Sequence, residues 1–426
     1  MTDWRIRAAG HAGLVLSSLL VALALVLTPA PGRPVAADER GNVPTAFSAE
    51  AAYQHVVYLA ASIGSRPAGS AAEAAAAAYL AEQLAGYGYQ VALQPFTIQV
   101  YEERGAYVAP LDGGDPIEAT ALLRSAAGVV RGELVDAGRG QPDEWPAGAL
   151  AGRVALIERG EIPFGEKVAN AAAAGAVAVI IYNNEPGTFA GSLGQQSAIP
   201  AVALDRAQGL ALRTRSAAEP LSVEVAVDAS VGQRQSQNVV GTRVGSDPCT
   251  IVVGAHYDSV SAGPGANDNG SGTATMLEVA RVMAERSHPC TLQFVAFGAE
   301  EIGLRGSQRF VETLPPEGHP LRAMLNLDMV GVGQEWWLAG APELIDAAQA
   351  VAESLGFEAS IGSPAGASSD HESFARAGVP VLFVHRRPDP NYHSPRDRAE
   401  YVEPELLATA GALTLGVLEH LAVAEE

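Results

Sequence analysis

The sequence that decides the fold runs from residue 248 to residue 301 and reads PCTIVVGAHYDSVSAGPGANDNGSGTATMLEVARVMAERSHPCTLQFVAFGAEE. Its two apolar runs, 249–256 and 292–297, have the length of buried strands, and residues 271–285 between them predict a helix. Downstream, the same alternation predicts further strands at 323–327 and 379–384 and further helices at 303–314, 343–355 and 403–422. Strands that alternate with helices indicate an α/β fold whose mostly parallel sheet is covered on both faces.

The region upstream of this alternation divides into two parts. Residues 46–88 predict helices, in which Leu80 and Leu84 are spaced i, i+4, and residues 89–100 alternate like a strand. Residues 103–232 have a different texture, with short apolar runs, Gly/Pro-rich loops and one small helix at 164–174. We therefore predict a small β-rich domain, 103–232, inserted into an α/β domain made of residues 45–102 and 233–424.

The N-terminus has the pattern of an export signal. Arg5 and Arg7 precede an apolar run at 12–27, and the stretch ends in Val35-Ala36-Ala37. This order predicts a signal peptide, residues 1–37, cleaved after Ala37, and hence a secreted or extracytoplasmic protein. The alternative is an uncleaved membrane anchor, although the apolar run of 16 residues is shorter than the roughly 20 residues of a bilayer span.

Composition narrows the function classes. The chain has 426 residues, 48% of them hydrophobic and 18% charged, which is an ordinary globular balance. Its formal net charge of −21 argues against a nucleic-acid partner, because binding phosphates requires clustered Lys and Arg.

The two cysteines occur in matching phrases. Cys249 and Cys290 each follow a proline, precede a threonine and open a predicted strand. Parallel neighbouring strands that begin at the same level place such thiols side by side. We predict a Cys249–Cys290 disulfide, which suits an oxidising compartment; the alternative is two buried free thiols.

Polar residues with metal-binding side chains follow the predicted strands. His256 ends one strand, Glu300 and Glu301 lie just past a second, Asp328 closes a third, and His393 follows a fourth across a loop. Taken singly, each has a structural explanation, such as a hydrogen-bonded histidine, a helix-terminal charge or an N-cap. Because ligands bind at the carboxyl ends of the strands in open α/β sheets, the whole set indicates a metal site.

The residue types suit zinc chemistry. Zinc takes imidazole nitrogen and carboxylate oxygen, and two ions about 3.5–4 Å apart need a carboxylate between them. Asp268, in the glycine-rich loop 263–270, can supply that carboxylate. Asp258, two residues after His256, can accept the imidazole N–H. One of Glu300 and Glu301 is expected to bind metal and the other to act as base, because adjacent residues in extended chain point in opposite directions.

Four phrases resemble a known family: GAHYDS (254–259), GANDNGSG (265–272), FGAEEIGLRGS (297–307) and NYHS (391–394). They look like the secreted co-catalytic dizinc aminopeptidases, the leucine aminopeptidase-like and aminopeptidase Y-like enzymes. GRVALIERG (152–160) and the strand at 199–201 resemble a protease-associated domain. The resemblance implies a three-layer α/β/α zinc peptidase domain with a mostly parallel mixed sheet, two Zn²⁺ per chain, and peptide or protein N-termini as substrate.

The resemblance also implies a role for each residue of the set. The metal ligands form two groups around one bridging carboxylate: Asp268 bridges, His256 and Asp328 complete one ion, and Glu301 and His393 complete the other. Glu300 is implied as the general base that takes a proton from the attacking water and returns it to the leaving amine. Tyr392 matches a tyrosine that hydrogen-bonds the developing oxyanion, although it can equally be a packing residue.

Three other functions stay open. A carboxypeptidase of the glutamate carboxypeptidase type needs basic groups for the substrate carboxylate, and Arg386 and Arg387 could provide them unless they are a solvated pair. A glutaminyl cyclase-like transferase uses one zinc, against which the presence of both His256 and Asp328 argues. A receptor-like binding protein of this fold loses ligands, and none is missing here.

The remaining candidates receive structural predictions. The segment Ser369-Asp370-His371 is expected to flank the pocket without binding metal. Five histidines are expected to be surface or packing residues: His55, His288, His319, His385 and His420. For the inserted domain, substrate gating, protein contact and a passive spacer all remain open.

Overall fold

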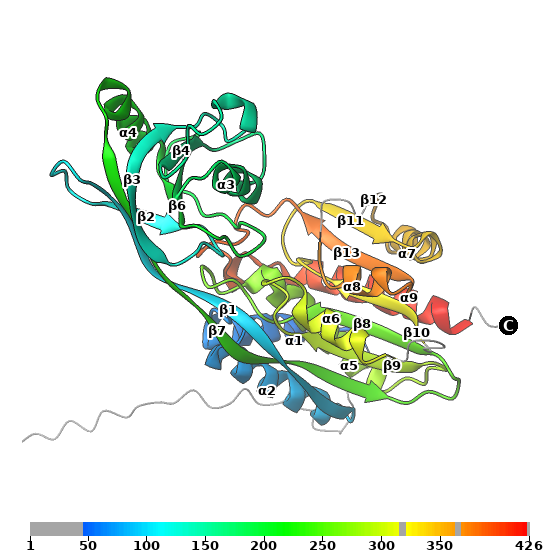
Figure 1. Ribbon diagram of the computed structural model, residues 1–426. Helices are drawn as coiled ribbons and strands as arrows, with labels where there is room; N and C mark the ends of the chain where they lie inside the picture. The colour runs from blue at the N-terminus through cyan, green and yellow to red at the C-terminus, as the bar shows by residue number, and fades with distance from the viewer. Residues whose placement is uncertain (1–45, 315–320, 363–367, 424–426) are drawn as a thin grey trace, which may run out of the picture.

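The computed structural model describes residues 46–314, 321–362 and 368–423. The predicted signal peptide, residues 1–37, and His319 lie outside the described residues. Two bodies are visible in Figure 1, a larger α/β domain and a smaller domain joined to it by the long strands β1 and β7.

A mixed sheet forms the centre of the α/β domain. Its four central strands are parallel and lie in the order β9 (Thr291–Phe297), β8 (Thr250–His256), β10 (Leu321–Leu327) and β13 (Val381–Arg387). Antiparallel strands flank them: β7 (Ser222–Arg243) pairs with β9, and β11 (Glu335–Gly340) pairs with β13 and, in parallel, with β12 (Ala359–Ile361). The predicted mostly parallel mixed sheet is therefore confirmed.

Helices cover both faces of this sheet (Figure 1). One face carries α1 (Ala49–Val57), α2 (Ala71–Gly86), α5 (Gly272–Ala284), α7 (Pro342–Leu355) and α9 (Pro404–Val423). The other carries α6 (Arg305–Glu312) and α8 (His371–Arg376), whose Phe310 and Phe374 pack on Phe297 of β9. Leu80 and Leu84 of α2 are fully buried, as their spacing predicts. The three-layer α/β/α prediction is confirmed.

Several elements differ from the sequence prediction. The helix α6 begins at Arg305 rather than at residue 303, because Leu304 has a φ of 59°, a left-handed conformation that a right-handed helix cannot include. The strands β11 and β12 and the short helix α8 were not predicted. Short helical turns occur at η1 (Tyr58–Ile63), η2 (Pro142–Glu144), η3 (Ala266–Ser271) and η4 (Ala399–Tyr401).

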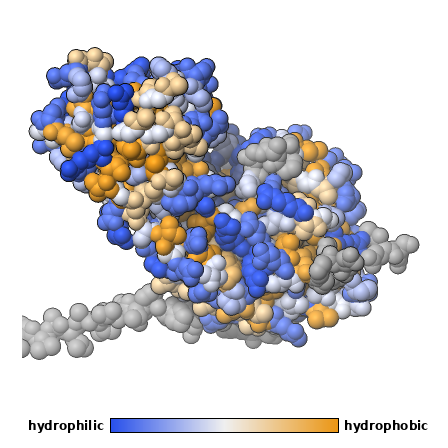
Figure 2. Space-filling view, viewed as in Figure 1, coloured by the Kyte–Doolittle hydropathy of each residue, from blue (hydrophilic) through white to orange (hydrophobic). Residues whose placement is uncertain are grey.

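The smaller domain is a closed ring of seven strands. In spatial order these are β1 (Gln90–Pro110), β2 (Ile117–Ala121), β6 (Ala201–Leu204), β5 (Ala178–Tyr182), β4 (Val154–Glu158), β3 (Gly128–Asp136) and β7, which pairs with β1 and closes the ring. Two helices flank it, the expected α3 (Phe164–Ala173) and an unpredicted α4 (Arg206–Ala218). Its surface carries apolar side chains among polar ones (Figure 2). Val129 and Val231 of this domain are 62% and 52% exposed.

The two domains share the strands β1 and β7. These strands pair without interruption from Gln90 opposite Thr242 to Pro110 opposite Val223, with one register shift between Glu103 and Gly105. The expected strand 89–100 thus continues to residue 110. Both predicted domain boundaries, after residues 102 and 232, fall inside these strands, near the register shift. The connection is a continuous antiparallel ribbon, which the polar residues at 102–104 concealed in the sequence.

The disulfide is present. Cys249 and Cys290 are bonded, with their Cα atoms 4.7 Å apart. They precede β8 and β9, whose first residues, Thr250 and Thr291, pair in parallel. The predicted bridge is confirmed, and it ties the amino ends of two central strands.

One described helix is long and apolar enough to cross a membrane, residues Pro404–Ala422 of α9. Half of that stretch is buried inside the protein. Its Leu407, Leu413 and Leu418 belong to the core between the helices and the sheet, so α9 has the burial of a core helix.

Candidate metal centre

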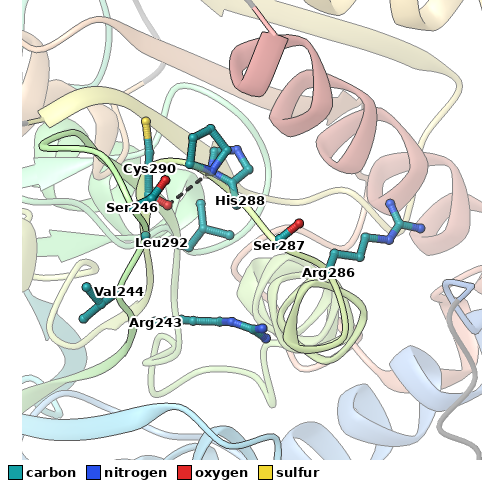
Figure 3. Close-up of a pocket in the computed structure, with 10 residues that line it drawn as sticks. Arg243, Val244, Ser246, Arg286, Ser287, His288, Cys290 and Leu292 are labelled. Carbon is teal, nitrogen blue, oxygen red and sulfur yellow. Dashed lines mark hydrogen bonds between the residues drawn. The ribbon is translucent and has the colours of Figure 1, made fainter.

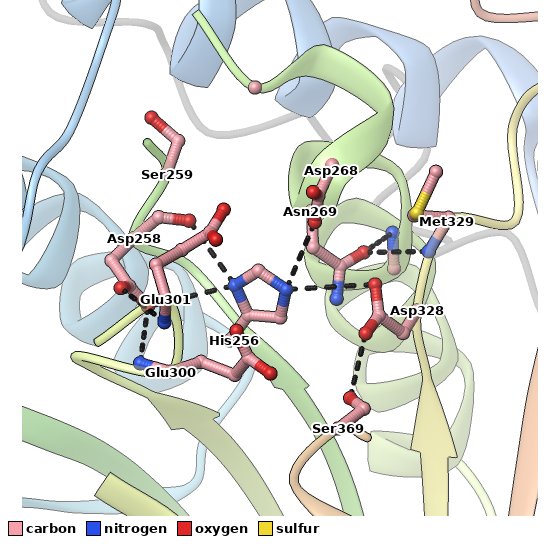
Figure 4. Close-up of polar contacts among 12 residues, drawn as sticks. His256, Asp258, Ser259, Asp268, Asn269, Glu300, Glu301, Asp328, Met329 and Ser369 are labelled. Carbon is pink, nitrogen blue, oxygen red and sulfur yellow. Dashed lines mark hydrogen bonds and ion pairs between the residues drawn. The ribbon is translucent and has the colours of Figure 1, made fainter. Parts of the chain in front are cut away.

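The predicted site residues meet at the carboxyl ends of the central strands. His256 is the last residue of β8, Glu300 and Glu301 follow β9, and Asp328 follows β10. Asp268 comes from η3, between β8 and α5, and His393 from the loop after β13. All six line one cavity of about 330 Å³, and Figure 4 shows several of these side chains turned toward His256. The convergence expected from strand order is confirmed.

The ligand atoms form two groups that share Asp268. In the first group, His256 Nε2 lies 3.2 Å from Asp268 Oδ1 and 3.6 Å from Asp328 Oδ1. In the second, His393 Nε2 lies 3.0 Å from Asp268 Oδ2 and 3.0 Å from Glu301 Oε2. Each oxygen of the Asp268 carboxylate therefore faces a different imidazole, which is the arrangement of a bridging ligand.

These distances fit zinc. Two ligand atoms that each lie about 2.0–2.1 Å from one tetrahedral ion are separated by roughly 3.3 Å. The four contacts above fall around that value. In addition, Glu301 Oε1 and Asp328 Oδ1 are buried and have no hydrogen-bond partner among the described residues. Buried, unpartnered carboxylate oxygens are costly unless a cation or donor satisfies them. The residues present therefore fit a metal ion in each group.

Burial and mutual charge shift the pKa values of the group. Burial raises the pKa of Glu301 to about 7, against the hydrogen bond to His393, which lowers it. Burial lowers the pKa of His393, but its hydrogen bonds to Asp268 and Glu301 raise it to about 10. For His256, burial again lowers the pKa, while the charges of Glu300 and other carboxylates raise it well above its usual value. Without metal, the cluster holds protons that a bound cation would displace.

Glu300 and Glu301 belong to two different ligand clusters, both of which include His256. The Glu301 carboxylate clusters with His256 and Asp268, whereas that of Glu300 clusters with His256 and Asp328, all ligand atoms within a cluster lying within 4.8 Å of one another. Burial raises the pKa of Glu300 well above its ordinary value, and the neighbouring His256 partly opposes that rise. Both side chains line the cavity, as a ligand and a base at one site require. Ala299, directly before them, has a left-handed φ of 57°.

Asp258 anchors the backbone of these glutamates. Its Oδ1 accepts a hydrogen bond from the N–H of Glu300 at 3.0 Å, and its Oδ2 accepts one from Glu301 at 3.2 Å (Figure 4). His256 Nδ1 lies 3.2 Å from the main-chain oxygen of Asp258 and 3.6 Å from its carboxylate. The predicted contact between Asp258 and His256 exists. The main-chain oxygen of Asp258 lies closer to the imidazole than its carboxylate does, because the carboxylate accepts hydrogen bonds from residues 300 and 301.

Two partners that the sequence did not indicate hold the Asp268 loop. Asp397 accepts hydrogen bonds from the N–H groups of Asn267 at 2.7 Å and Asp268 at 3.0 Å. The side chain of Asn269 bonds the Leu327 carbonyl at 2.9 Å and the N–H of Met329 at 3.3 Å. Asn269 is fully buried.

Arg66 joins the two loops that carry Asp258 and Asp268. It is fully buried, and its guanidinium donates to the carbonyls of Tyr257 at 2.8 Å, Gly265 at 2.9 Å and Pro264 at 2.6 Å. Burial lowers its pKa to about 10, while nearby carboxylates, Asp258 first, oppose the decrease. No sequence signal marked Arg66, because its partners are backbone carbonyls almost 200 residues away.

The cavity wall includes aromatic residues. Tyr392 stacks on His393 with ring centroids 3.8 Å apart and is half exposed. Burial and the carboxylates around it, Asp268 first, raise its pKa, so its hydroxyl remains a hydrogen-bond donor. His385 also lines the cavity, and its Nδ1 lies 2.8 Å from the Asp328 carbonyl. His385 also stacks on Phe383, with ring centroids 5.4 Å apart, so it packs as expected while it lines the cavity.

The segment Ser369-Asp370-His371 lies behind the ligands. Ser369 Oγ donates to Asp328 Oδ2 at 2.7 Å (Figure 4), and all three residues are buried. Neither Asp370 nor His371 falls in a metal-ligand cluster found within the described residues. This position agrees with the expected supporting role.

The arginine pair lies outside the cavity. The guanidinium of Arg386 stacks on Trp336 at 4.8 Å, and that of Arg387 stacks on Trp337 at 5.4 Å. Among the described residues that line the cavity, none is Arg or Lys. Arg386 and Arg387, which a carboxypeptidase function would need for the substrate carboxylate, therefore pack on tryptophans outside the cavity.

A second hollow lies at the opposite end of the central strands. It measures about 400 Å³ and is lined by Arg243, Arg286, His288 and Cys290, with no carboxylate in its described lining (Figure 3). His288 contacts the carbonyls of Cys290 at 3.2 Å and Leu418 at 3.1 Å, which makes it the packing residue that was expected. His55 is likewise buried and bonded to Tyr79.

Known proteins share these features. The model of Peptidase family M28 matches residues 238–418, and that of the PA domain matches residues 130–212. Aminopeptidase YwaD of Bacillus subtilis is 34% identical over 415 residues, which cover 91% of this chain and 87% of that protein. The probable lipoprotein aminopeptidase LpqL of Mycobacterium tuberculosis is 33% identical over 71% of this chain, which spans 63% of that relative's length.

A solved structure agrees with this kinship. BSAP, described as a zinc aminopeptidase from Bacillus subtilis, superimposes with a TM-score of 0.77 at 31% identity, covering 90% of this chain and 98% of that one. Because the superposition covers 90% of this chain, the similarity extends over both domains. The chain, with its PA domain carried on the β1–β7 ribbon, belongs to Peptidase family M28.

Proposed function

We propose that this chain is an exported aminopeptidase that binds two zinc ions and uses Glu300 as its general base. One observation carries the proposal: the two oxygens of Asp268 lie 3.2 Å from His256 Nε2 and 3.0 Å from His393 Nε2. A carboxylate shared in this way joins two ligand sets into one centre. Membership of a peptidase family and the names of the relatives support peptide-bond hydrolysis from the amino end.

Each zinc ion has its own ligands in this proposal. His256, Asp328 and one oxygen of Asp268 would hold the first ion, while His393, Glu301 and the other oxygen of Asp268 would hold the second. Bound zinc lowers the pKa of the attacking water and places positive charge beside the substrate carbonyl. Asp258, Ser369 and Asp397 keep the ligands and the base in position through their hydrogen bonds.

The protein side chains move the protons. Glu300 accepts a proton from the water that attacks the peptide carbonyl and returns it to the leaving amine, so one carboxylate serves both steps. The Tyr392 hydroxyl donates to the carbonyl oxygen as negative charge develops there. Glu300 suits this role because its carboxylate lies near His256 and Asp328 without sharing a close contact with His393.

The charge of the cavity favours a free amino terminus. Its lining carries the carboxylates of five acidic residues and, among the described residues, no Arg or Lys. A positively charged substrate amine is therefore complementary to the site, whereas a terminal carboxylate is repelled. Met329, Phe383 and Tyr392 add apolar surface, which supports an apolar first residue.

Export has independent support. Residues 1–37 have the pattern of a signal peptide, the Cys249–Cys290 bridge suits an oxidising compartment, and one relative is named a lipoprotein. Peptide or protein N-termini are the proposed partners. The net charge of −21 disfavours nucleic acid, and a membrane becomes a partner only if the N-terminal segment stays attached.

The decisive experiment combines metal counting with substrate polarity. The purified protein should contain two zinc ions per chain and hydrolyse leucine p-nitroanilide; a chelator should abolish that activity and zinc should restore it. N-acetylated leucine p-nitroanilide should resist cleavage. Full activity with a single bound zinc would reject the two-metal centre, and trimming of an N-blocked peptide from its carboxyl end would reject the aminopeptidase.

A further inference from the structure

A groove runs between the PA domain and the loop that carries Glu300 and Glu301. It has a volume of about 320 Å³. Its walls come from the β1–β7 ribbon, two loops of the PA domain and the segment directly after Glu301. The residues that carry the argument are Ile98, Leu123, Arg124, Val231, Ile302 and Arg305. We call this feature the interdomain groove.

The interdomain groove begins beside the catalytic glutamates. Ile302 lines the groove and is the next residue after Glu301, so their Cα atoms are about 3.8 Å apart. Ile302 packs on a buried cluster that contains Ile98 of the ribbon and Ala299, the residue before Glu300. The groove floor and the catalytic loop are therefore parts of one packed unit.

The groove carries two arginines that are not paired with a carboxylate. Within the described part of the chain, Arg124 forms no ion pair, and Arg305 donates only to the Gln308 side chain, at 3.3 Å. Two other arginines of the PA domain, by contrast, are paired with carboxylates: Arg131 with Glu224 at 2.7 Å and Arg213 with Asp136 at 2.6 Å. In a chain of net charge −21, two unneutralised guanidinium groups in one groove are complementary to an anion.

Backbone geometry presents Arg124 to the groove. Its φ is 72°, a left-handed conformation that costs a non-glycine residue free energy. The surrounding loop holds it there, since the N–H of Ser197 donates to the Arg124 carbonyl at 2.8 Å. Strained residues that the structure maintains in this way concentrate at binding sites.

Exposed apolar side chains complete the groove. Leu123 is 41% exposed and Val231 is 52% exposed, and both line it. Apolar walls with cationic groups match an extended peptide, whose side chains contact the walls while its carboxylates meet the guanidinium groups.

We propose that the interdomain groove binds the part of a peptide substrate that follows the scissile bond, and that Arg124 and Arg305 bind its carboxylates. The inference rests on the proposed aminopeptidase function. An aminopeptidase retains the first residue in its cavity, and a peptide that extends from there past the catalytic loop reaches the groove at Ile302, the residue after Glu301. The carboxylate can be the terminus of a short peptide or an acidic side chain further along.

The test compares substrates that do and do not reach the groove. Leucine p-nitroanilide has no residue beyond the scissile bond and reports on the metal centre alone. Three peptides extend further: Leu-Gly-Gly-Gly with a free terminus, its amide, and the amide of Leu-Gly-Asp-Gly. Wild type, Arg124→Gln, Arg305→Gln and the double variant are assayed with each, and Arg131→Gln serves as a matched control on the outer wall of the PA domain.

The double variant should raise KM by about 3- to 10-fold for the peptides that bear a carboxylate. The uncharged amide, the anilide and the Arg131→Gln control should keep their wild-type values, and added salt should reduce the difference. The free-terminus and aspartate peptides separate the two sources of carboxylate.

Unchanged KM for both carboxylate peptides in the double variant overturns the inference, and the PA domain then does not contribute to binding of the substrate carboxylate. An equal change in Arg131→Gln, or in the anilide, overturns it as well, because the effect is then not specific to the groove. Failure of wild type to cleave the anilide instead rejects the proposed function.

Discussion

The carboxylate of Asp397 holds the main chain of Asp268: its Oδ2 accepts a hydrogen bond from the Asp268 N–H at 3.0 Å, although 129 residues separate the two in sequence. Its other oxygen accepts from Asn267 at 2.7 Å. The residue whose carboxylate faces both imidazoles is thus positioned by a second acid that touches neither imidazole within the described contacts. Residues in such positions affect metal affinity by roughly 10- to 100-fold.

Asp397→Asn should weaken zinc binding by about 10- to 100-fold while leaving turnover of the zinc-saturated enzyme near that of wild type. The amide replaces one acceptor oxygen with a donor, so it cannot accept from both N–H groups. Competition with a chromogenic chelator measures the affinity. Asp228→Asn, at an exposed ion pair with Arg104, is the control, and equal zinc affinity in both variants would remove the proposed role of Asp397.

Glu300→Gln should lower kcat by about 10²- to 10⁴-fold, the range for loss of a general base, and should retain two zinc ions per chain. The adjacent Glu301→Gln is the matched comparison. It removes a ligand that lies 3.0 Å from His393 Nε2 and should lose zinc. Metal analysis together with kcat distinguishes the two. Near wild-type turnover in Glu300→Gln would assign the base elsewhere.

Tyr392→Phe should lower kcat by about 10- to 100-fold with little change in KM, because a donor to the developing oxyanion acts mainly in the transition state. The phenylalanine ring preserves the stacking on His393, whose centroid lies 3.8 Å away. Steady-state kinetics on leucine p-nitroanilide measures the change. A variant with wild-type kcat would leave Tyr392 with the packing role alone.

Removing the disulfide with the double variant Cys249→Ser/Cys290→Ser should lower the free energy of unfolding by about 2–4 kcal/mol. The bridge closes a loop whose ends are 41 residues apart and restricts the unfolded chain. Because the bridge lies at the amino ends of β8 and β9, activity of the folded variant should persist. Urea unfolding and an activity assay at 25 °C check both parts, and loss of zinc from the folded variant would contradict the second.

Acid should destabilise the protein in part through His55. Burial, and secondarily the charge of Arg281, lower the pKa of His55 to about 4, and its ring nitrogens contact the hydroxyls of Tyr79 and Tyr87. The unfolded chain, with a histidine pKa of about 6.5, binds more protons than the native state between pH 4 and 6.5. The contribution of His55 to the free energy of unfolding is therefore fully present above pH 6.5 and decreases as the pH falls toward 4.

The matched variant His55→Gln should remove this component. Between pH 7 and pH 5, wild type should lose about 2 kcal/mol more unfolding free energy than the variant. Denaturant unfolding of both proteins at the two pH values gives the difference directly. Parallel pH curves would mean that His55 titrates normally in the native state.

Local sequence patterns were enough to locate the ligands. The apolar run before His256 and the alternation of strands and helices predicted a parallel sheet, and the carboxyl ends of parallel strands lie at one edge. That rule alone predicts that His256, Glu301 and Asp328 lie close together. The matching sequences around the two cysteines predicted the disulfide for the same reason, because Thr250 and Thr291, the residues after them, are direct neighbours in the sheet.

Local sequence patterns did not predict the contacts that hold the ligand loops in place. Arg66 bonds backbone carbonyls, which every residue possesses, so its partners leave no trace in the local pattern. Arg386 and Arg387 lie opposite Trp336 and Glu335 of β11, an antiparallel strand that was not predicted. This pairing determines where the two arginine side chains lie. The contact between His385 Nδ1 and the Asp328 carbonyl depends on that same packing.

The sequence by itself determined the fold class, the bridge between Cys249 and Cys290 and the identity of the proposed ligands, because periodicity and residue type are local properties. Only the tertiary structure decided that Asp268 faces two imidazoles at once, that Asp397 and Arg66 hold its loop, and that Arg124 lines the same groove as Ile302, the residue after Glu301. The contacts of Asp397 and Arg66 with this loop join residues 129 to 199 positions apart. They arise from the packing of whole elements, which no short stretch of sequence specifies.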